Sequence, residues 1–436
     1  MNFTIKTIGC KVNSYESNKL KDELIDMGLK YVDVEEKDNY GTLDFYIVNT
    51  CSVTKIADKK SRQMLHLAKK YNPNVKVIAI GCLVDSITVG NTHKEVGATQ
   101  CEPALSSVDY LLSNKEKNKL PELINSLIKD KLVKENDKHN QKSTKGLSNS
   151  RIRAFIKIQD GCNQYCSYCI IPYLRGSIKS RNDEDIINEI TDKAKNGVKE
   201  IVLTGIHLSS FGLDRAKINY ENDGAIDIGR ESLIGIMKRI SLIDGIERLR
   251  LGSLEPRIIN DYFLKELISD DNKLLKEKFC ANFCLSLQSG SDKILKNMNR
   301  HYNTEDFEKS CDLIRKYMPN ATITTDVIVG FPGESEDDFK ESLEFVKRMR
   351  FYNPNIFPYS RRQGTKADTM INQLTNTDKH RRAKIMIEEC DKISKEIEEE
   401  YNKTKHDILA EEVVCENGKK YAIGYTKEYI KLKIKI

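Results

Sequence analysis

The 436-residue sequence predicts an α/β protein with two successive parallel β/α domains and a short β-rich end. Short apolar runs alternate with amphipathic helical stretches along both large parts of the chain, which is typical of parallel sheets covered by helices. A polar stretch rich in Lys and Asn separates these two parts. Near the C-terminus, lysines alternate with apolar residues, which favours strands.

Composition excludes several classes of protein. Charged residues make up 31% and apolar residues 39%, which indicates a globular rather than a disordered or fibrous chain. The 71 Lys and Arg exceed the 65 Asp and Glu only slightly, so net charge alone does not identify a partner. We see neither a membrane-spanning apolar stretch nor a secretory signal, and we expect a cytoplasmic protein. Because disulfides are rare there, the twelve cysteines need another explanation.

The first part of the chain, residues 1–128, is expected to form a doubly wound parallel sheet. Its β-prone runs and helical patterns alternate in this order: Phe3–Ile8, Tyr15–Met27, Phe45–Val48, Asp58–Tyr71 and Val75–Ile80. The apolar pattern then fails, and Lys, Asn, Ser and Gly dominate residues 129–150. This composition predicts a linker.

Residues 151–375 repeat the alternation in six β/α units, which predicts a partial (β/α)6 barrel. The expected strands are Ala154–Gln159, Glu200–Gly205, Arg248–Leu251, Phe283–Gln288, Thr322–Val329 and Asn355–Tyr359. Helices are expected between them, including Asp183–Asn196, Glu231–Ile243, Glu305–Tyr317 and Glu336–Arg348. The polar stretch Leu213–Gly229 indicates an insertion after the second strand. A helical connector, residues 376–405, and a β-rich segment, residues 406–436, follow the barrel.

Three cysteines directly follow the first expected barrel strand, in DGCNQYCSYCIIPYLRG. Cys162, Cys166 and Cys169 form a CxxxCxxC pattern, and three thiolates this close can hold a soft metal centre. Structural zinc needs a fourth ligand, and none lies nearby in the sequence. A 4Fe–4S cluster on three cysteines instead leaves one iron open, and barrels carry their sites at the carboxyl ends of strands. We therefore expect a cluster here rather than core thiols.

This pattern after the first strand of a six-unit barrel resembles the radical S-adenosylmethionine enzymes. The resemblance implies that the open iron binds S-adenosylmethionine, whose reductive cleavage yields a 5′-deoxyadenosyl radical that removes a substrate hydrogen. The aromatic residue before the third cysteine, Tyr168, matches the position that packs on the adenine in that family.

A second cysteine set lies in the first domain. Cys10, Cys51 and Cys82 each close an apolar run, so each is expected at the carboxyl end of a strand. Those ends line one edge of an open parallel sheet, where such folds bind ligands. The spacing alone leaves two alternatives open, which are a metal site and three buried small hydrophobic residues.

Longer motifs resemble the methylthiotransferase family. TIGCKVNSYES, VNTCSVT and AIGCLVD are similar to the three cysteine motifs of its N-terminal domain, and further similar motifs run from IVLTGIHLSSFG to FPYSRRQGT. The resemblance implies that Cys10, Cys51 and Cys82 hold an auxiliary 4Fe–4S cluster. The chain would therefore carry two 4Fe–4S clusters and use S-adenosylmethionine. The wording GCKVN, LTGIHLSS and LSLQSG is most similar to the branch acting on N6-threonylcarbamoyladenosine in tRNA.

The resemblance implies that a methylthio group replaces the C2 hydrogen of that anticodon-loop adenosine in tRNA. It also implies an electron donor such as a flavodoxin or ferredoxin, and we expect a monomer that does not bind membranes. Alternatives are the same chemistry on isopentenyladenosine in tRNA or on a ribosomal-protein side chain. A more distant alternative is a non-catalytic RNA-binding protein with structural metal sites.

Polar residues at the other strand ends are candidate S-adenosylmethionine contacts, although turn or cap roles are equally compatible with them. They are Thr204, Gly205, Ser253, Glu255 and Gln288. Cys284 stands where the family tends to carry His, and we leave its role open. We expect His207 to be structural, and Cys101, Cys280, Cys311, Cys390 and Cys415 to be ordinary thiols.

The last residues concentrate positive charge. Glu416–Ile436 holds six Lys against two Glu, with Tyr421, Tyr425 and Tyr429 interleaved. Lysines attract phosphates and aromatic rings stack on unpaired bases. The segment resembles an abbreviated form of the small all-β RNA-binding (TRAM-like) domain that ends many methylthiotransferases. Because it has room for only three strands, it should pack on the barrel or on the connector helix.

Overall fold

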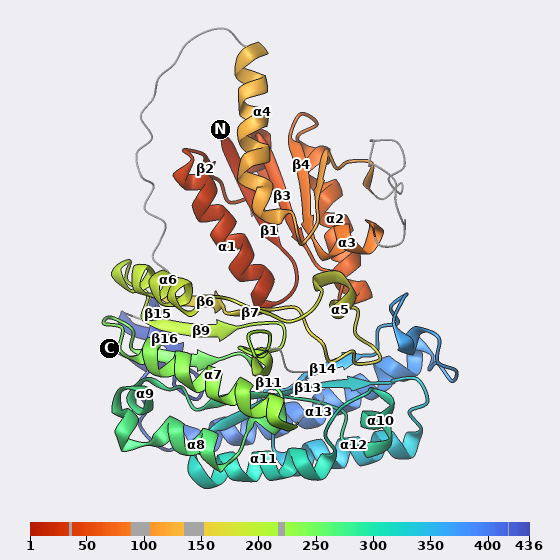
Figure 1. The fold of residues 1–436 in the computed structure, drawn as a ribbon, viewed down its shortest axis with the longest axis vertical. Helices are drawn as coiled ribbons and strands as arrows, with labels where there is room; N and C mark the ends of the chain where they lie inside the picture. The colour runs from red at the N-terminus through yellow and green to blue at the C-terminus, as the bar shows by residue number, and fades with distance from the viewer. Residues whose placement is uncertain (35–36, 89–104, 135–151, 217–222, 417) are drawn as a thin grey trace. The chain divides into compact units, whose positions relative to one another are not determined.

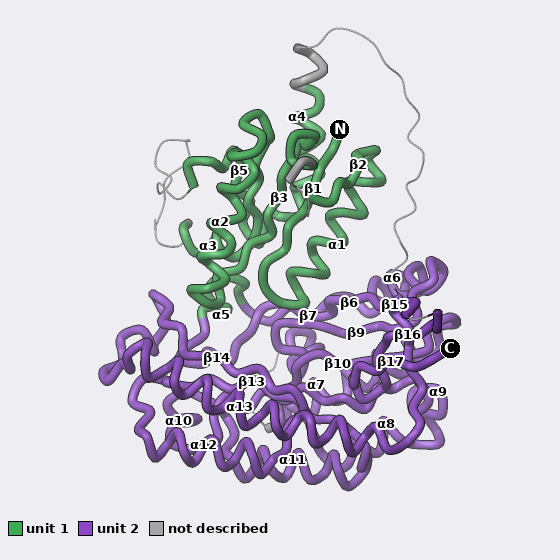
Figure 2. Tube along the Cα trace, turned by 180° about the vertical axis from the view of Figure 1, so that it is seen from behind, with its two compact units in different colours: residues 1–149, 170–176 green, residues 150–169, 177–436 purple. Residues whose placement is uncertain are grey.

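The computed structural model describes residues 1–34, 37–88, 105–134, 152–216, 223–416 and 418–436. The chain divides into two compact units (Figures 1 and 2). Unit 1 comprises Met1–Asn149 and Ile170–Gly176, and unit 2 comprises Ser150–Cys169 and Ser177–Ile436. None of the described helices combines the length and apolar character needed to cross a bilayer.

Unit 1 contains a five-stranded, all-parallel sheet in the order β2-β1-β3-β4-β5. Its strands are β1 (Asn2–Thr7), β2 (Lys30–Tyr31), β3 (Phe45–Thr50), β4 (Lys76–Gly81) and β5 (Tyr110–Leu112). Its α-helices are α1 (Lys11–Asp26), α2 (Lys55–Tyr71), α3 (Cys82–Thr88), α4 (Leu120–Lys134) and α5 (Ile171–Arg175), and Lys37–Thr42 and Lys117–Lys119 form 3₁₀ turns. Helix α4 extends past the expected start of the linker at Lys129.

Alternating side chains give the sheet of unit 1 two apolar faces. Phe45 and Ile47 of β3 pack with Leu20 and Leu24 of α1 and with Leu120 of α4. Residues Tyr46 and Val48, on the opposite face of the same strand, pack with Leu65 of α2 and Leu83 of α3. Because helices cover both faces, the expected doubly wound sheet is confirmed.

Unit 2 contains six parallel β/α steps arranged as a partial barrel. The strands are β6 (Arg153–Lys157), β9 (Glu200–Thr204), β10 (Arg248–Leu251), β11 (Ser253–Leu254), β12 (Asn282–Gln288), β13 (Thr322–Val329) and β14 (Asn355–Pro358). They pair as β10-β9-β6 and β11-β12-β13-β14, so the third step is one strand interrupted at Gly252. Among the described residues β6 does not pair with β14, which leaves the barrel open.

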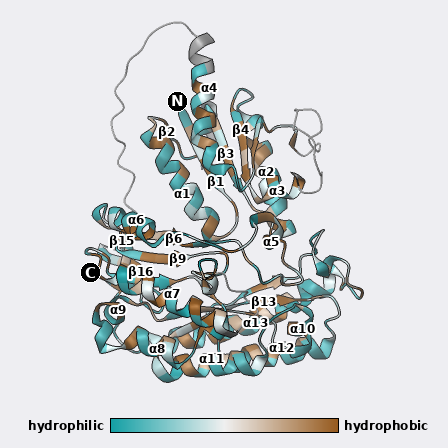
Figure 3. Ribbon diagram, viewed as in Figure 1, coloured by the Kyte–Doolittle hydropathy of each residue, from teal (hydrophilic) through white to brown (hydrophobic). Residues whose placement is uncertain are grey.

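Helices surround this barrel and bury one large apolar core (Figures 1 and 3). They are α6 (Asp183–Lys195), α7 (Asp223–Ser241), α8 (Asp261–Ile268), α9 (Lys273–Lys278), α10 (Asp292–Asn297), α11 (Thr304–Tyr317), α12 (Glu336–Met349) and α13 (Asn376–Tyr401). Short pieces join them: the paired strands β7 (Gln159–Asp160) and β8 (Lys179–Ser180), and 3₁₀ turns at Leu208–Ser210, Pro256–Ile258, Asp270–Asn272 and Lys366–Asp368.

Helix α7 begins inside the expected insertion Leu213–Gly229, so that expectation was wrong from Asp223 onward. Tertiary contacts explain the difference. Ala225 is fully buried, and the buried Arg230 donates from Nε to the Ile258 carbonyl at 2.8 Å and from Nη2 to the Arg257 carbonyl at 2.8 Å. The polar composition of this stretch could not reveal these partners.

The C-terminal residues form a three-stranded antiparallel sheet of β15 (Leu409–Glu416), β16 (Lys419–Tyr425) and β17 (Lys431–Lys435). This sheet packs on the barrel, as its size predicted. Arg248 Nη1 donates to the Tyr425 carbonyl at 2.6 Å, and Arg250 Nη1 donates to the Lys427 carbonyl at 2.9 Å. Both arginines lie on β10. The β-rich C-terminal end of the expected fold is therefore confirmed.

The interpretation of two tyrosines as base-stacking residues is not supported. The Tyr425 and Tyr429 rings stack on each other at 4.5 Å between centroids. Arg153 lies 5.0 Å from the Tyr425 ring centroid, and Arg250 lies 4.6 Å from that of Tyr429. The rings therefore fasten the small sheet to barrel arginines, because a guanidinium is attracted to an aromatic face.

Candidate functional site

The cysteine loop of unit 2 leaves the barrel after β7. Cys162 and Cys166 are buried and Cys169 is half-buried. Ser167, between the last two cysteines, donates from N to the Met298 carbonyl at 3.0 Å and from Oγ to the Asn297 carbonyl at 2.8 Å. Its own carbonyl accepts from the Ala367 N–H at 2.7 Å. The loop is therefore held by segments that follow the fourth and sixth barrel steps.

Two donors reach the buried sulfurs. Arg300 Nη1 donates to Cys166 Sγ at 3.0 Å, and the Gln164 N–H lies 3.5 Å from Cys162 Sγ. The Arg300 guanidinium also donates from Nε to the Tyr302 hydroxyl at 2.9 Å. Burial raises the pKa of the Cys162 thiol to about 12, so an electropositive group is needed to hold its thiolate at neutral pH.

Within the described part of the chain, no three His, Cys, Asp or Glu side chains gather as ligands of one metal ion. The ligands of a single zinc ion all lie within about 2.3 Å of one centre. Thiolates on a four-iron cluster bind different irons and therefore stand farther apart. Three cysteines on one anchored loop, with donors aimed at two sulfurs, fit that second arrangement.

The expected polar residues lie at the strand ends of unit 2, and Glu255 is the one that contacts the cysteine loop. Buried Glu255 accepts from Gln164 Nε2 at 3.3 Å, and its second oxygen accepts from Arg257 Nε. His207 Nε2 lies 3.6 Å from the same carboxylate. Burial lowers the pKa of His207 to about 4, so its imidazole is neutral at physiological pH.

The other expected S-adenosylmethionine contacts each have their own surroundings in unit 2. Thr204 is buried, and a Cβ on Gly205 would lie 2.8 Å from Gln159 Oε1. The exposed Ser253 has its Oγ 3.2 Å from Cys284 Sγ on the paired strand β12. At the end of β12, Gln288 is buried with a φ of 72°, and Tyr168 packs against the apolar cluster that includes Met298 and Phe331.

Sequence reasoning missed Arg300. It follows the motif LSLQSG by ten residues, but its distance from the cysteines along the chain hid the contact with Cys166. Cys284, for which no role was predicted, lies beside the candidate Ser253 and is therefore near the expected site.

The cysteines of unit 1 lie at the carboxyl ends of three adjacent strands. Cys10 follows β1 and caps α1, Cys51 follows β3, and Cys82 follows β4. Because β1, β3 and β4 are neighbours in one parallel sheet, the three residues share one sheet edge, as expected. Cys10 is exposed, whereas Cys51 and Cys82 are buried.

A close approach joins the first two cysteine loops. Gly9, with a φ of 116°, lies so near Cys51 that a Cβ would be 3.0 Å from its Sγ. Asn13 Nδ2 donates to the carbonyls of Ile8 at 2.7 Å and Thr50 at 3.1 Å. These residues directly flank Gly9–Cys10 and Cys51, so a single amide side chain holds both loops together.

Helix α5, in unit 1, supports this edge. Arg175 Nη2 donates to Asn13 Oδ1 at 2.8 Å, and its Nη1 lies 3.2 Å from Glu16 Oε1. Glu16 is also paired with Lys117 at 2.5 Å. The side chains of Arg175 and Glu16 are 2% and 6% exposed, so the charges are buried and must remain paired. Residues 170–176 fall inside the expected barrel range 151–375, and these contacts explain why they group with unit 1.

The third cysteine has a separate support. Asn114 Nδ2 lies 3.4 Å from Cys82 Sγ, and the Asn114 N–H donates to Asp85 at 3.1 Å. Burial raises the pKa of Asp85. Asn13 and Asn114 therefore fix the three loops of this edge from its two sides.

We expect Arg175→Met to loosen the unit 1 cysteine edge. The change removes the buried donor of Asn13 Oδ1 and one of the two cations that pair with Glu16, leaving Lys117 as the other, at a cost of about 1–3 kcal/mol. Metal-free protein should unfold at lower denaturant concentration, and Cys51 should react faster with a thiol reagent. Arg239→Met, which breaks only an exposed pair with Glu184, is the matched control and should change neither measurement. Equal behaviour of the two variants would contradict the support role of Arg175.

Comparisons with known proteins agree with this architecture. The model described as "Radical SAM superfamily" matches residues 156–346, and that described as "Uncharacterized protein family UPF0004" matches residues 2–97. A solved structure, the radical S-adenosylmethionine methyltransferase TsrM from Kitasatospora setae, superposes with a TM-score of 0.57 at 13% identity. The superposition covers 84% of this chain and 77% of the TsrM chain. At this identity the similarity shows the fold alone.

Curated relatives span nearly the whole chain. The threonylcarbamoyladenosine tRNA methylthiotransferase MtaB of Aquifex aeolicus is 34% identical, covering 96% of this chain and 94% of that protein. MtaB of Bacillus subtilis is 32% identical, covering 98% and 89%. The tRNA-2-methylthio-N(6)-dimethylallyladenosine synthase of Endomicrobium trichonymphae is 33% identical, covering 99% and 95%.

The match over residues 156–346 and the full-length relatives identify unit 2 as a radical S-adenosylmethionine domain. With the matching N-terminal domain and full-length relatives, the chain belongs to the radical S-adenosylmethionine methylthiotransferase family. Enzymes of this family use two 4Fe–4S clusters and S-adenosylmethionine.

Proposed function

We propose that this chain replaces the C2 hydrogen of N6-threonylcarbamoyladenosine, next to the tRNA anticodon, with a methylthio group. The observation that carries the proposal is the presence of two separate three-cysteine sets. One set lies at the carboxyl ends of three parallel strands and the other on a single loop after the first barrel step, in a chain whose full-length relatives are tRNA methylthiotransferases. One cluster site would suffice for radical chemistry alone, so the second indicates a sulfur-transfer role.

The residues divide between the two cofactor sites. Cys162, Cys166 and Cys169 would hold the radical cluster, and Cys10, Cys51 and Cys82 the auxiliary cluster. When bound, the clusters and S-adenosylmethionine would supply the radical chemistry and the methylthio group, with the electron coming from the donor protein. The cofactors must supply this chemistry because the aromatic C2–H is not acidic, which makes acid–base catalysis a poor route. The S-adenosylmethionine contacts would be Tyr168, Thr204, Gly205, Ser253, Glu255 and Gln288.

Arg300 and His207 would support the radical site. A donor on the Cys166 sulfur stabilises negative charge there, and hydrogen bonds to cluster sulfurs are one determinant of reduction potential. The neutral His207 lies beside Glu255, and Gln164 joins this carboxylate to the cysteine loop. His207 and Gln164 therefore orient Glu255, and the neutral imidazole adds no positive charge to the site.

The choice of substrate rests on the sequences of three motifs. Relatives named for threonylcarbamoyladenosine and for dimethylallyladenosine are similarly distant, at 34% and 33% identity. GCKVN, LTGIHLSS and LSLQSG are more similar to the threonylcarbamoyladenosine branch, which favours that substrate.

We further propose a monomer that acts in the cytoplasm and receives electrons from a flavodoxin or ferredoxin.

Nucleoside mass spectrometry of tRNA from a strain lacking this gene tests the proposal. We expect the 2-methylthio form of N6-threonylcarbamoyladenosine to disappear, its unthiolated precursor to accumulate, and the wild-type gene to restore the product. Loss of the 2-methylthio isopentenyl nucleoside instead would assign the other tRNA substrate. An unchanged tRNA profile together with an altered ribosomal protein mass would overturn the tRNA assignment.

A further inference from the structure

Helix α2 of unit 1 is strongly basic. Its 17 residues contain six Lys or Arg against one Asp, whereas α1 of the same unit contains three Lys against four acidic residues. The whole chain has an excess of only six positive charges. The net charge of α2 (six minus one, or +5) therefore nearly equals that of the whole chain. The helix begins four residues after Cys51.

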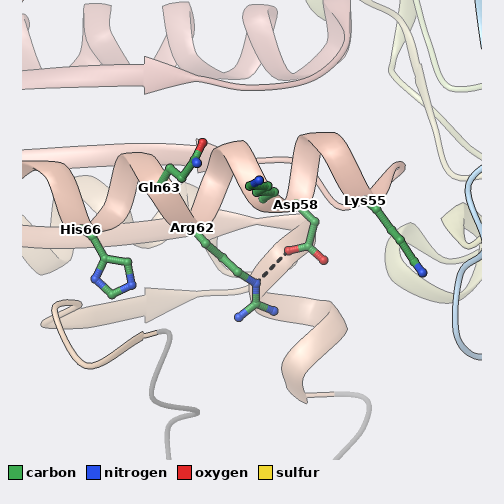
Figure 4. A pocket seen from close by; sticks show the side chains of 6 residues that line it. Lys55, Asp58, Arg62, Gln63 and His66 are labelled. Atoms are coloured by element: carbon green, nitrogen blue, oxygen red, sulfur yellow. Dashed lines mark hydrogen bonds and ion pairs between the residues drawn. The ribbon is translucent and has the colours of Figure 1, made fainter.

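The charges lie on the face of α2 that does not contact the sheet. Ser61, Leu65 and Ala68 form the buried stripe. On another side, a shallow cavity of ≈ 320 Å³ is lined by Lys55, Asp58, Lys59, Arg62, Gln63 and His66. Figure 4 shows Lys55, Arg62 and His66 extending to the same side of the helix. From Lys55 to His66 this face is about 16 Å long at 1.5 Å per residue.

The residues that line this cavity carry more positive than negative charge. Asp58 is its one acidic residue and pairs with Arg62 at 3.0 Å. The exposed Lys59 and Lys60 form no ion pair within the described residues. A concentration of positive charge attracts polyanions, and its interaction with phosphates is salt-dependent.

Two exposed apolar side chains lie at or just before the start of α2, close in the chain to both Cys51 and Lys55. Val53 is 43% exposed and Ile56 is 62% exposed, and both follow Cys51 closely in the chain. Thr54 between them caps α2, accepting from the Ala57 N–H at 3.1 Å, so the position of the segment is fixed. Apolar side chains beside a basic face suit an unpaired RNA strand, whose bases offer apolar faces and whose backbone is anionic.

We infer that the Lys55–Lys59–Arg62 face of α2 binds the phosphate backbone of the single-stranded tRNA loop whose adenosine is modified at the Cys10–Cys51–Cys82 edge. This inference rests on the proposed function and deepens it by assigning an RNA contact outside the C-terminal sheet. An acidic electron-donor protein is disfavoured as the occupant, because the electron is needed at the radical cluster and α2 adjoins the other cysteine set. The face would position the loop without reading its sequence, since backbone contacts carry no base information.

The test is the triple variant Lys55→Gln/Lys59→Gln/Arg62→Gln in the full-length, cluster-loaded protein. The matched control removes three exposed lysines of unit 2, Lys309→Gln/Lys316→Gln/Lys340→Gln. Dissociation constants for substrate tRNA are measured across a salt series. We expect about tenfold or greater weakening at low salt and a log–log salt slope smaller by about two to three, with little change in the control. Iron content and melting temperature verify that the α2 variant is folded.

The outcomes separate this inference from the proposed function. If wild-type protein binds and modifies tRNA and the α2 variant binds with the same affinity and salt slope, the inference is overturned alone. If only reduction by flavodoxin is impaired in the variant, the face is a donor-protein site and the inference is again wrong. If wild-type protein neither binds nor modifies tRNA, the proposed function fails first.

Discussion

Replacing Cys162, Cys166 and Cys169 together with alanine is expected to abolish reductive cleavage of S-adenosylmethionine. The corresponding replacement of Cys10, Cys51 and Cys82 should preserve this cleavage and abolish methylthio product. The reason is that the first set lies on the barrel loop beside Arg300 and Glu255, whereas the second lies at a separate sheet edge in unit 1. Anaerobically reconstituted wild type should hold about eight irons, and each triple variant about four.

A cysteine outside both sets provides the control. Cys311 is fully buried in α11 within the apolar core, so Cys311→Ala should change stability but neither iron content nor product. Product formation by the Cys10/Cys51/Cys82 variant would show that these residues are ordinary core thiols. Zinc in place of iron in wild-type protein would refute the two-cluster assignment.

Local sequence patterns were sufficient to predict the cysteine edges. Cys10, Cys51 and Cys82 each follow a short apolar run, and such a run is the sequence pattern typical of a buried parallel strand. Their shared edge then follows from parallel topology, without knowledge of side-chain contacts. The six barrel steps were predicted by the same alternation, although the break of the third strand at Gly252 was not.

Partners far apart in the sequence could not be predicted. Arg300 and Cys166 are 134 residues apart, and Arg175 and Glu16 are 159 apart. The tyrosines near the C-terminus show the same limit. Interleaved Lys and Tyr indicated RNA contact, but Arg153 and Arg250 occupy the rings of Tyr425 and Tyr429. A composition pattern shows which types of side chain are present, but it does not show which residues those side chains contact.

These contacts make a C-terminal truncation a poor probe of RNA binding. Deleting Glu416–Ile436 would remove the backbone carbonyls that accept from Arg248 Nη1 and Arg250 Nη1, so these buried side chains of the barrel would lose part of their hydrogen bonding. On β17, Lys431, Lys433 and Lys435 are exposed and alternate with Leu432 and Ile434. Lysine substitutions on this strand therefore test RNA binding without disturbing the anchor.

The anchor itself depends on Glu200. Its carboxylate is fully buried and accepts from Arg153 Nε at 2.8 Å and from Arg250 Nε at 3.0 Å. Arg153 also bridges to Glu411 of β15 at 2.9 Å, so the same network joins the barrel to the C-terminal sheet. Although burial alone would raise the pKa of Glu200, Arg250 and Arg153 outweigh it and hold that pKa below its usual range.

We expect Glu200→Gln to destabilise unit 2 by about 3–5 kcal/mol, because it leaves the buried Arg250 without its balancing charge and Arg153 with Glu411 alone. The C-terminal sheet should become sensitive to protease in the variant, and tRNA affinity should fall with it. Glu247→Gln, which breaks an exposed pair with Lys199, is the matched control and should change stability by less than about 0.5 kcal/mol. Indistinguishable unfolding midpoints for the two variants would show that Glu200 does not anchor the sheet.

The pH dependence gives an independent measurement of the same interaction. A carboxyl whose pKa is depressed by folding stabilises the protein above its unfolded-state pKa of about 4.3. That contribution is lost as pH falls through the lower folded-state pKa, because protonation removes the charge that pairs with Arg153 and Arg250. Wild-type stability should therefore decline on acidification below about pH 4, and Glu200→Gln should show a shallower decline over this range. Parallel stability–pH curves for wild type and variant would indicate that Glu200 carries no net ion-pair stabilisation, and the anchor would then depend on the stacked tyrosines and the backbone hydrogen bonds.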